Sequence, residues 1–214
     1  MKDDKRQYQT TPDRRSELHD RILRFAINAF AEQGLKAVKM DYIARQLGIS
    51  KRTLYEIYDT KETMLLEGIK LFKDLNDAEL HDIATSEGVS VIDIILYLYK
   101  KKVEESKRVN PLFYTELSMY PHVLSILKQD QQVMRQRLSD FIERGENEGY
   151  FRTDTDRELF CTTFEVLTAH IMNSRLYQQY SVEALMRNML LVALRGICTR
   201  KGVDALDSAL ATIV

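Results

Sequence analysis

Basic side chains stand at the amino ends of three short helices expected near the start of the chain. Lys39 precedes the first helix, Lys51 and Arg52 begin the second, and Lys61 begins the third. A helix start carries about half a positive charge and unpaired N–H donors, so a cation there costs about 0.3–1 kcal/mol unless an anion offsets it. A phosphate backbone would supply that anion at several helix starts at once. These residues therefore predict a head that binds DNA.

The elements that must position these cations can be predicted from capping signals. Helix 40–47 is closed by Gly48, and Ser50 is a good N-cap for a helix that runs to about residue 58. Two short helices joined by such a turn form a helix-turn-helix, whose second helix enters the major groove by its amino-terminal residues.

The stretch from Ile22 to Leu65 resembles the DNA-binding domain of TetR/AcrR-type repressors. The resemblance covers about a fifth of the chain; the remainder matches only in length, helix count and the segment 149–154. It lies in turn, cap and core residues: Ile22, Leu23, Ala26, Phe30, Gly34, Ile43, Ala44, Leu47, Gly48, Ile49, Ser50, Thr53, Leu54, Tyr55, Lys61 and Glu62. It implies an all-α regulator with an N-terminal helix-turn-helix and a helical ligand-binding and dimerisation body.

By this resemblance, the second helix of the motif faces the groove and its neighbours hold phosphates. Arginine and lysine side chains can reach O6 and N7 of guanine, so Lys51 and Arg52 are candidates for reading bases. Glu56 departs from the family pattern and would either accept a bond from cytosine N4 or repel phosphate. The predicted DNA-binding residues are Lys39, Ser50, Lys51, Arg52, Thr53, Tyr55, Glu56 and Lys61. The alternatives are that Lys39 and Lys51 are ordinary solvated lysines and that Tyr55 packs on the first helix.

Charge is unevenly distributed along the 214 residues. Residues 1–61 hold 13 Lys and Arg against 9 Asp and Glu, a formal charge of +4, whereas the whole chain carries -1 and the remainder therefore -5. A basic head on an acidic body suits DNA at one end only. The two cysteines are too few for a disulfide framework, and no apolar run approaches a signal peptide or membrane span, so we expect a soluble cytoplasmic protein with two buried thiols.

Few prolines and glycines interrupt the chain, and 3.6-residue spacing of apolar residues predicts an all-α fold. Residues 2–16 are polar and expected to be loose, with a first helix ending at Gly34. The further helices are expected at about 61–83, 91–109, 111–120, 121–148, 155–180 and 182–200, with a weak helix in 203–214. We assign residues 1–62 to the arm and DNA-binding domain and residues 63–214 to the ligand-binding and dimerisation domain.

The two helices expected at about 155–180 and 182–200 are apolar around nearly their whole circumference. A helix with one buried face should show only a stripe, so the excess predicts a four-helix interface with a second copy of the chain. The alternative is two central core helices of a monomer. The predicted interface residues are Phe160, Phe164, Leu167, Ile171, Met186, Met189, Leu190, Ala193, Leu194 and Ile197.

The resemblance also implies a small-molecule effector, which would favour a spacing of the two heads that misfits a pseudo-palindromic operator. Methionine and aromatic side chains suit an apolar or flat ligand, although such residues are more often plain core. The candidates are Phe113, Tyr114, Met119, Tyr120, Met134, Phe164, Met172 and the polar anchors His170 and Asn173.

Two other classes of function are alternatives to a regulator. An enzyme is disfavoured because the chain has no Glu-x-x-His, His-Glu-x-x-His or Gly-x-Ser-x-Gly motif and no phosphate-binding glycine loop. We therefore expect no catalytic residues, no metal and no cofactor. A helical interaction protein whose head no longer binds DNA is the second alternative. Whether the protein represses or activates is left open by the residues, although a repressor fits the resemblance.

Overall fold

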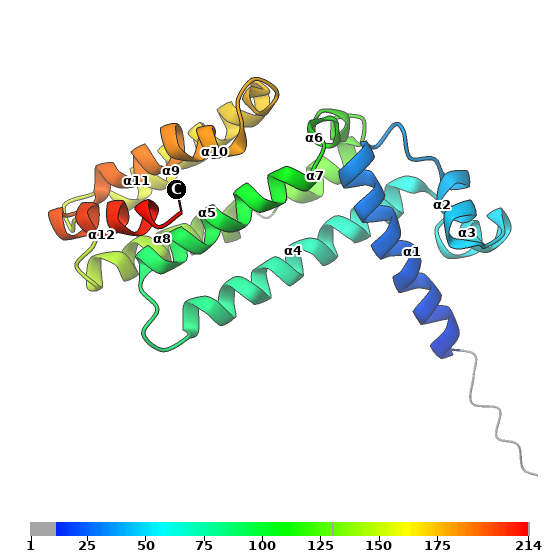
Figure 1. Cartoon of the computed structure of the whole chain (residues 1–214), viewed down its shortest axis with the longest axis horizontal. Helices are drawn as coiled ribbons and strands as arrows, with labels where there is room; N and C mark the ends of the chain where they lie inside the picture. Colours follow the sequence, from blue (N-terminus) through cyan, green and yellow to red (C-terminus); the bar gives the residue numbers. More distant parts are fainter. Residues whose placement is uncertain (1–11, 130, 214) are drawn as a thin grey trace, which may run out of the picture.

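Two long helices, α1 (Pro12–Gln33) and α4 (Lys61–Thr85), cross near one end of the molecule, where α2 (Met40–Leu47) and α3 (Lys51–Ile57) complete the head (Figure 1). The computed structural model describes residues 12–129 and 131–213. The first helix begins at Pro12, within the segment 2–16 that was expected to be loose. Proline is favourable in a first helical turn because its missing N–H would be unpaired there. Residues 2–11 lie outside the described part of the chain.

The core of the head extends beyond the first three helices. Leu54 of α3 and Leu65 of α4 are buried in one apolar cluster, which also holds Leu117 from the body. The crossing of α1 and α4 is close at Gly68, where an added Cβ would stand 2.0 Å from the Ile27 side chain. Packing therefore continues across residues 62 and 63. The division proposed there separates two functions and is not a break in the core.

The middle of the chain forms α5 (Val91–Arg108), α6 (Pro111–Leu117), α7 (Pro121–Gln129) and α8 (Gln131–Asn147). Ser90 starts α5 with a capping box, in which its hydroxyl accepts the Asp93 N–H while the Asp93 carboxylate accepts the Ser90 N–H at 2.9 Å. The sequence predicted one helix over 121–148. The described residues of that range instead fall into α7 and α8, with residue 130 between them outside the description.

The last part of the chain forms α9 (Arg157–Asn173), η1 (Leu176–Gln178), α10 (Val182–Leu185), η2 (Met186–Leu190), α11 (Leu191–Ile197) and α12 (Arg200–Ala211). Asp156 caps α9 by accepting the Leu159 N–H at 3.0 Å. The helix expected to reach residue 180 ends at Asn173, because Arg175 takes the left-handed conformation with φ 52°. From η2, a π-helical turn, the chain continues directly into α11.

Within the described residues, the regular structure is helical apart from a single antiparallel bridge between Phe151 and Cys198. This confirms the all-α prediction. Cys161 and Cys198 are both buried free thiols, as expected. Over residues 12–129 and 131–213, no helix has the length and apolar character that crossing a bilayer demands.

Candidate nucleic-acid interface

The turn between α2 and α3 is held by two local features that the sequence predicted. Gly48 adopts φ 66°, a left-handed conformation that closes α2, and the Ile49 N–H donates to the Ala44 carbonyl at 3.0 Å. Ser50 then caps α3, because its hydroxyl accepts the Thr53 N–H at 3.0 Å. The three-residue turn therefore fixes where α3 starts.

The orientation of α3 is set by Leu54, the one residue of this helix classed as buried. Its side chain belongs to the same apolar core of the head as Phe30 and Ile43. The opposite face of α3 is consequently turned to solvent. Exposed on α3 are Lys51, Arg52, Tyr55 and Glu56. This spacing of i, i+1, i+4 and i+5 forms a single face of a helix, as insertion into a groove requires.

Ser50 and Thr53 stand at the start of that face but are engaged with each other. Their hydroxyl oxygens lie 2.8 Å apart, in addition to the capping bond. Thr53 is half-buried. Both residues therefore fix the helix start first, and any contact of theirs with DNA would use the remaining hydroxyl capacity.

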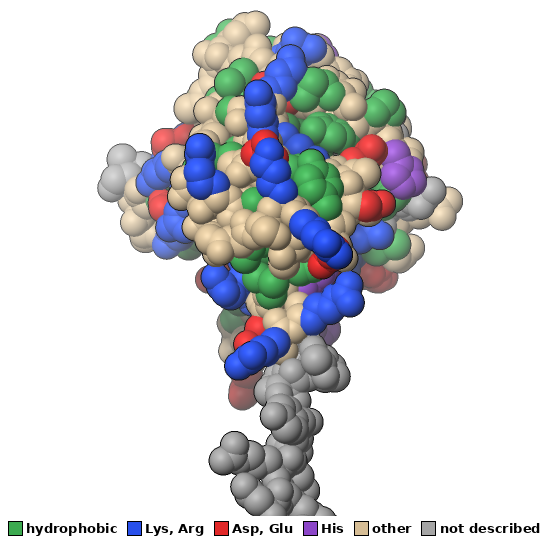
Figure 2. Space-filling model, turned by 90° about the vertical axis from the view of Figure 1, so that its right-hand side faces the viewer, with side chains coloured by type: hydrophobic (Ala, Val, Ile, Leu, Met, Phe, Trp, Pro, Cys, Tyr) green, Lys and Arg blue, Asp and Glu red, His purple; other side chains and the backbone are tan. Residues whose placement is uncertain are grey.

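Lys39 begins α2 in an extended conformation, and its own side chain makes no capping hydrogen bond. Its side chain is exposed beside a hollow of about 260 Å³ that Asp41, Tyr42 and Arg45 also line. Figure 2 views the end of the molecule where α2 and α3 lie, and Lys and Arg side chains are distributed over it. The amino end of α2 is thus open to an anion such as a phosphate.

Lys61 occupies a different position from the one expected of a phosphate contact. Its ammonium donates to the carbonyl of Leu35 and, at 2.5 Å, to that of Val38, and it lies 5.1 Å from the centre of the Phe30 ring. Partial burial lowers the pKa of Lys61 below its ordinary value, although the nearby Glu116 carboxylate acts in the opposite direction. Lys61 thus holds the loop between α1 and α2, and its contact with a phosphate stays a prediction.

Carboxylates accompany both cations on the exposed face of α3. The Lys51 ammonium forms an ion pair with Asp41 on α2, and the Arg52 Nε donates to the Glu56 carboxylate at 2.8 Å. The hydrogen bond and charge of Glu56 raise the pKa of Arg52 above its usual value. Asp41 was missed by sequence reasoning, since its partner lies on another helix and their contact depends on how the two helices cross.

Arg15 is a second residue that the sequence did not single out. It lies in the first turns of α1, and its guanidinium donates to the Glu56 carbonyl at 3.2 Å. Glu56 is near the end of α3, where carbonyls are unpaired and a cation is favourable. The start of α1 is therefore attached to the end of α3.

The predicted ligand residues do not converge on one enclosed site in the described structure. Phe113 and Tyr114 meet at 5.6 Å between ring centres, and Tyr114 meets Tyr177 of η1 at 5.5 Å. Burial raises the pKa of Tyr114. His170 lies at the exposed end of α9, with its Nδ1 3.3 Å from the Ser174 hydroxyl. Of the others, Tyr120 and Phe164 are half-buried, whereas Met119 after α6, Met134 on α8, and Met172 and Asn173 at the end of α9 are exposed.

A hollow of about 380 Å³ lies instead along α4 and α5. It is lined by polar and charged residues together with the ring of Tyr97: Glu79, Tyr97, Lys100, Lys101, Glu104, Glu105 and Arg108. None of the predicted ligand residues lines it. The candidates were selected by residue type, and sequence periodicity alone cannot tell which of them share one space.

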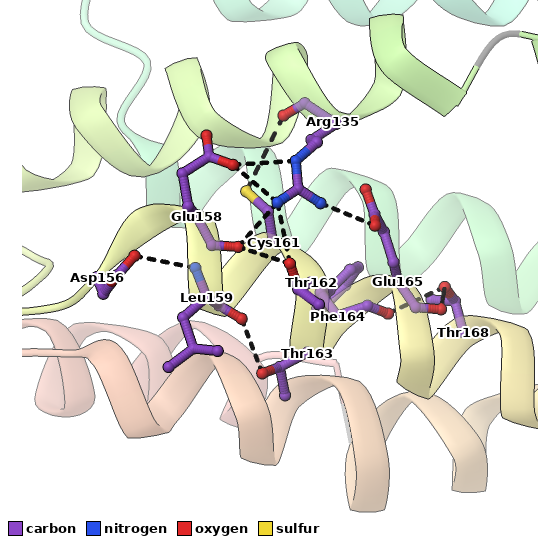
Figure 3. Close-up of polar contacts among 10 residues, drawn as sticks. All are labelled: Arg135, Asp156, Glu158, Leu159, Cys161, Thr162, Thr163, Phe164, Glu165 and Thr168. Carbon is purple, nitrogen blue, oxygen red and sulfur yellow. Dashed lines mark hydrogen bonds and ion pairs between the residues drawn. The ribbon is translucent and has the colours of Figure 1, made fainter.

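One face of α9 is attached to α8 through Arg135 (Figure 3). Its guanidinium donates to the carboxylates of Glu158 at 2.8 Å and Glu165 at 2.9 Å, and to the Thr162 hydroxyl at 2.9 Å. Leu159 points away from this network. Arg135 therefore fixes which face of α9 remains uncovered.

The predicted dimer residues divide into two sets. Leu159, Val166 and Val192 have exposed fractions of 65%, 64% and 55%, although none was predicted. Phe164, Leu167, Met186, Met189, Leu190 and Ala193 are half-buried, as expected of residues beside an open face. Phe160, Ile171, Leu194 and Ile197 are buried within the protomer. These four side chains therefore pack mainly inside their own protomer, and their part in an interface stays a prediction.

Comparison with known proteins gives a consistent result. Residues 22–67 match the family model described as bacterial regulatory proteins, tetR family. The chain is 31% identical over 144 residues to the HTH-type transcriptional repressor KstR2 of Mycobacterium tuberculosis, covering 64% of this chain and 71% of the relative. It is 27% identical over 150 residues to KstR2 of Rhodococcus jostii, covering 68% and 72% of the two chains.

Solved structures share the fold at lower sequence identity. A transcriptional regulator from Saccharomonospora viridis, solved in complex with choline, superposes with a TM-score of 0.67 at 21% identity, over 86% of this chain and all of that chain. The ketosteroid transcriptional regulator KstR2 of M. tuberculosis superposes with a TM-score of 0.54 at 24% identity, over 89% of this chain and 98% of that chain. These structures show the common arrangement of an N-terminal helix-turn-helix and a helical C-terminal domain.

Proposed function

The chain belongs to the TetR family of bacterial transcriptional regulators, which are not enzymes, and on this premise we propose that it is a dimeric repressor released from its operator by a small molecule. Its role as a DNA-binding regulator follows from the family. The observation that carries the proposal is the exposed face of α3, where Lys51, Arg52 and Tyr55 stand opposite the buried Leu54. Residues 1–62 serve DNA binding and residues 63–214 serve ligand binding and dimerisation.

Lys51 and Arg52 read base edges in the major groove, whereas Tyr55 and Lys39 hold phosphates. A cation can donate to guanine O6 and N7, and a phenolic hydroxyl can donate to a phosphate oxygen. Both base-reading residues lie in the first turn of α3, the part of a recognition helix that reaches furthest into the groove. Their exposure supports these assignments.

Dimerisation uses the uncovered side of α9 and α11. Leu159, Val166 and Val192 are apolar and more than half exposed, which is costly in water unless a second surface covers them. A two-fold axis through this face forms a four-helix contact between copies. The two recognition helices then lie about 34–36 Å apart, one turn of B-DNA, and read a pseudo-palindromic operator.

The effector is a small molecule, either an apolar ring system or an organic cation, held near α6. The aromatic rings of Phe113, Tyr114 and Tyr177 support this location, because they can present their faces or edges to a ring system. The relatives support the ligand class: one is described as a ketosteroid transcriptional regulator, and another was solved with choline, a quaternary ammonium compound. Aromatic rings accept both kinds of ligand.

Release from the operator proceeds through α6 and α4. The Asn110 N–H just before α6 donates to the Ala31 carbonyl at 2.7 Å, so α6 contacts the end of α1 directly. The first turns of α4 belong to the head core, while its later turns run along the body. A ligand that prefers another position of α6 would move the heads, and its differential affinity for the two arrangements sets the loss of operator affinity.

Fluorescence anisotropy with a selected operator duplex tests the proposal directly. Ketosteroids and quaternary ammonium compounds are titrated into the complex of protein and duplex. We expect one class to lower operator affinity by about 5- to 150-fold, the range of typical allosteric coupling. An operator affinity that stays constant in the presence of compounds shown by calorimetry to bind the protein would contradict the effector role.

A further inference from the structure

Each of the two cations on the exposed face of α3 is paired with a carboxylate in the protein without DNA. Lys51 pairs with Asp41 in the first turn of α2, and Arg52 pairs with Glu56 one helical turn further along α3. The side chains of all four residues are more than half exposed, and that of Arg52 has an exposed fraction of 89%. The pairs therefore lie on the surface that faces DNA.

Such pairs contribute little to folding stability, because water screens exposed charges and two long side chains lose freedom when they pair. The acids also weaken attraction to DNA, since each adds a negative charge beside a phosphate backbone. A stability role thus does not account for two acids at this place. The two acids instead affect how strongly Lys51 and Arg52 bind DNA.

We propose that Asp41 and Glu56 are specificity-determining residues, which lower affinity for DNA of arbitrary sequence more than affinity for the operator. This inference rests on the proposed role of α3 in reading DNA. It extends that role to two carboxylates, one of which lies outside the recognition helix.

The physical reason is a difference in what the cations gain on the two kinds of DNA. On arbitrary DNA, Lys51 and Arg52 gain only attraction to phosphates, and a carboxylate within hydrogen-bonding distance cancels much of it. On the operator, Arg52 can form two hydrogen bonds to one guanine, which compensates for the broken ion pair. The protein then discriminates against other sequences by repulsion between its carboxylates and the phosphates, as well as by its contacts to operator bases.

The variants Glu56→Gln and Asp41→Asn remove one negative charge each and keep the shape of the side chain. Glu32→Gln is the matched control, because Glu32 is an exposed acid at the far end of α1 and the variant has the same change in net charge. Affinity is measured for a selected operator duplex and for a random-sequence duplex over a range of salt concentrations. Thermal unfolding of each variant verifies that it is folded.

We expect Glu56→Gln and Asp41→Asn to raise affinity for random duplex by about three- to tenfold, with a smaller change on the operator. The slope of log affinity against log salt on random duplex should steepen by about one ion per variant, since one more cation then meets a phosphate. Glu32→Gln should change neither the discrimination ratio nor the slope to this extent.

A discrimination ratio that is unchanged or increased relative to Glu32→Gln would overturn the inference. An increase would mean that the two carboxylates weaken binding to the operator more than binding to other sequences. A fall in the ratio caused by lower operator affinity alone, with unchanged affinity for random duplex, would mean that Glu56 reads a base instead of excluding wrong sequences. Failure of the DNA-binding role itself gives a different result, because the unaltered protein would then show no preference for any duplex. The two failures are therefore distinguished by the unaltered protein alone.

Discussion

Glu116 on α6 accepts a hydrogen bond from the backbone N–H of Lys36 at 2.7 Å, and so joins the body to the loop that precedes α2. The contact lies beside Gly34, the glycine that ends α1 with φ 86°. Together with the bond from Asn110 to Ala31, it gives α6 two attachments to the head. A movement of α6 therefore acts directly on the position of the helix-turn-helix.

Glu116→Gln should weaken this attachment, because a hydrogen bond to a carboxylate is about twice as strong as one to a neutral amide. We expect the free energy of unfolding to fall by about 0.5–1.5 kcal/mol, and the effector to release the operator less completely. Urea unfolding and operator titration measure the two effects. Glu87→Gln, an exposed acid between α4 and α5, is the control and should change neither. Wild-type behaviour in both measurements would argue against a role of this contact in coupling.

Lys61→Met should lower folding stability, whereas Lys39→Met should change the salt dependence of DNA binding. Replacing Lys61 removes the bonds to the Leu35 and Val38 carbonyls, so we expect a loss of about 1–3 kcal/mol in unfolding free energy and an unchanged salt slope of DNA binding. Replacing Lys39 should leave stability within about 0.5 kcal/mol and reduce the salt slope by about one. Urea unfolding and salt-dependent titration decide the matter. A reduced salt slope in a folded Lys61→Met protein would restore the phosphate contact that the sequence predicted.

Val166→Lys combined with Val192→Lys should separate the dimer without unfolding the protomer. Both side chains are exposed, so a charge there costs little in the single protein but is unfavourable in an apolar contact. Sedimentation should show one copy of the chain, with unchanged helical circular dichroism. Leu194→Ala provides the contrast: this buried change should cost about 2–5 kcal/mol of stability. A double variant that still sediments as a dimer would place the interface elsewhere.

The buried thiols should react slowly while the protein is folded. Burial raises the pKa of Cys198 to about 11, so about one molecule in a thousand carries the thiolate at pH 8, whereas an ordinary thiol is about one quarter ionised. Alkylation at pH 8 should therefore be about two orders of magnitude slower than in denaturant. Burial also raises the pKa of Cys161. Equal rates in folded and unfolded protein would contradict the burial of both.

The same pKa shift makes stability depend on pH in alkaline solution. Since the pKa of Cys198 is higher in the folded than in the unfolded protein, the unfolded chain loses its proton first as pH rises. The unfolding free energy should accordingly fall between about pH 9 and pH 11, and a Cys198→Ala variant should lose that component of the decline. Unfolding in urea at several pH values provides the measurement.

The helix-turn-helix could be predicted closely because its boundaries are local. Gly48 and Ser50 end one helix and begin the next through bonds to residues at most four positions away. The break after α9 could not be predicted in the same way, since Arg175 takes a left-handed conformation that glycine or asparagine more commonly adopts. Local rules work where the residue type agrees with the conformation it takes.

The direction of long side chains and the inner face of apolar helices were beyond the sequence. Lys61 can reach outward or inward from the same backbone position, and only the place of the Leu35 and Val38 carbonyls decides between the two. Helices α9 and α11 are apolar on more than one side, so periodicity could not tell Phe160, which faces inward, from Leu159, which faces outward. Both cases depend on neighbours distant in sequence.

Selection of bound duplexes from a random pool at low ionic strength tests the central claim most directly. The account predicts enrichment of a pseudo-palindromic motif with half-sites about one helical turn apart, and loss of that enrichment in a folded variant carrying Lys51→Ala and Arg52→Ala. If the unaltered protein enriches no sequence over the starting pool, the assignment of α3 as a DNA-reading helix is contradicted.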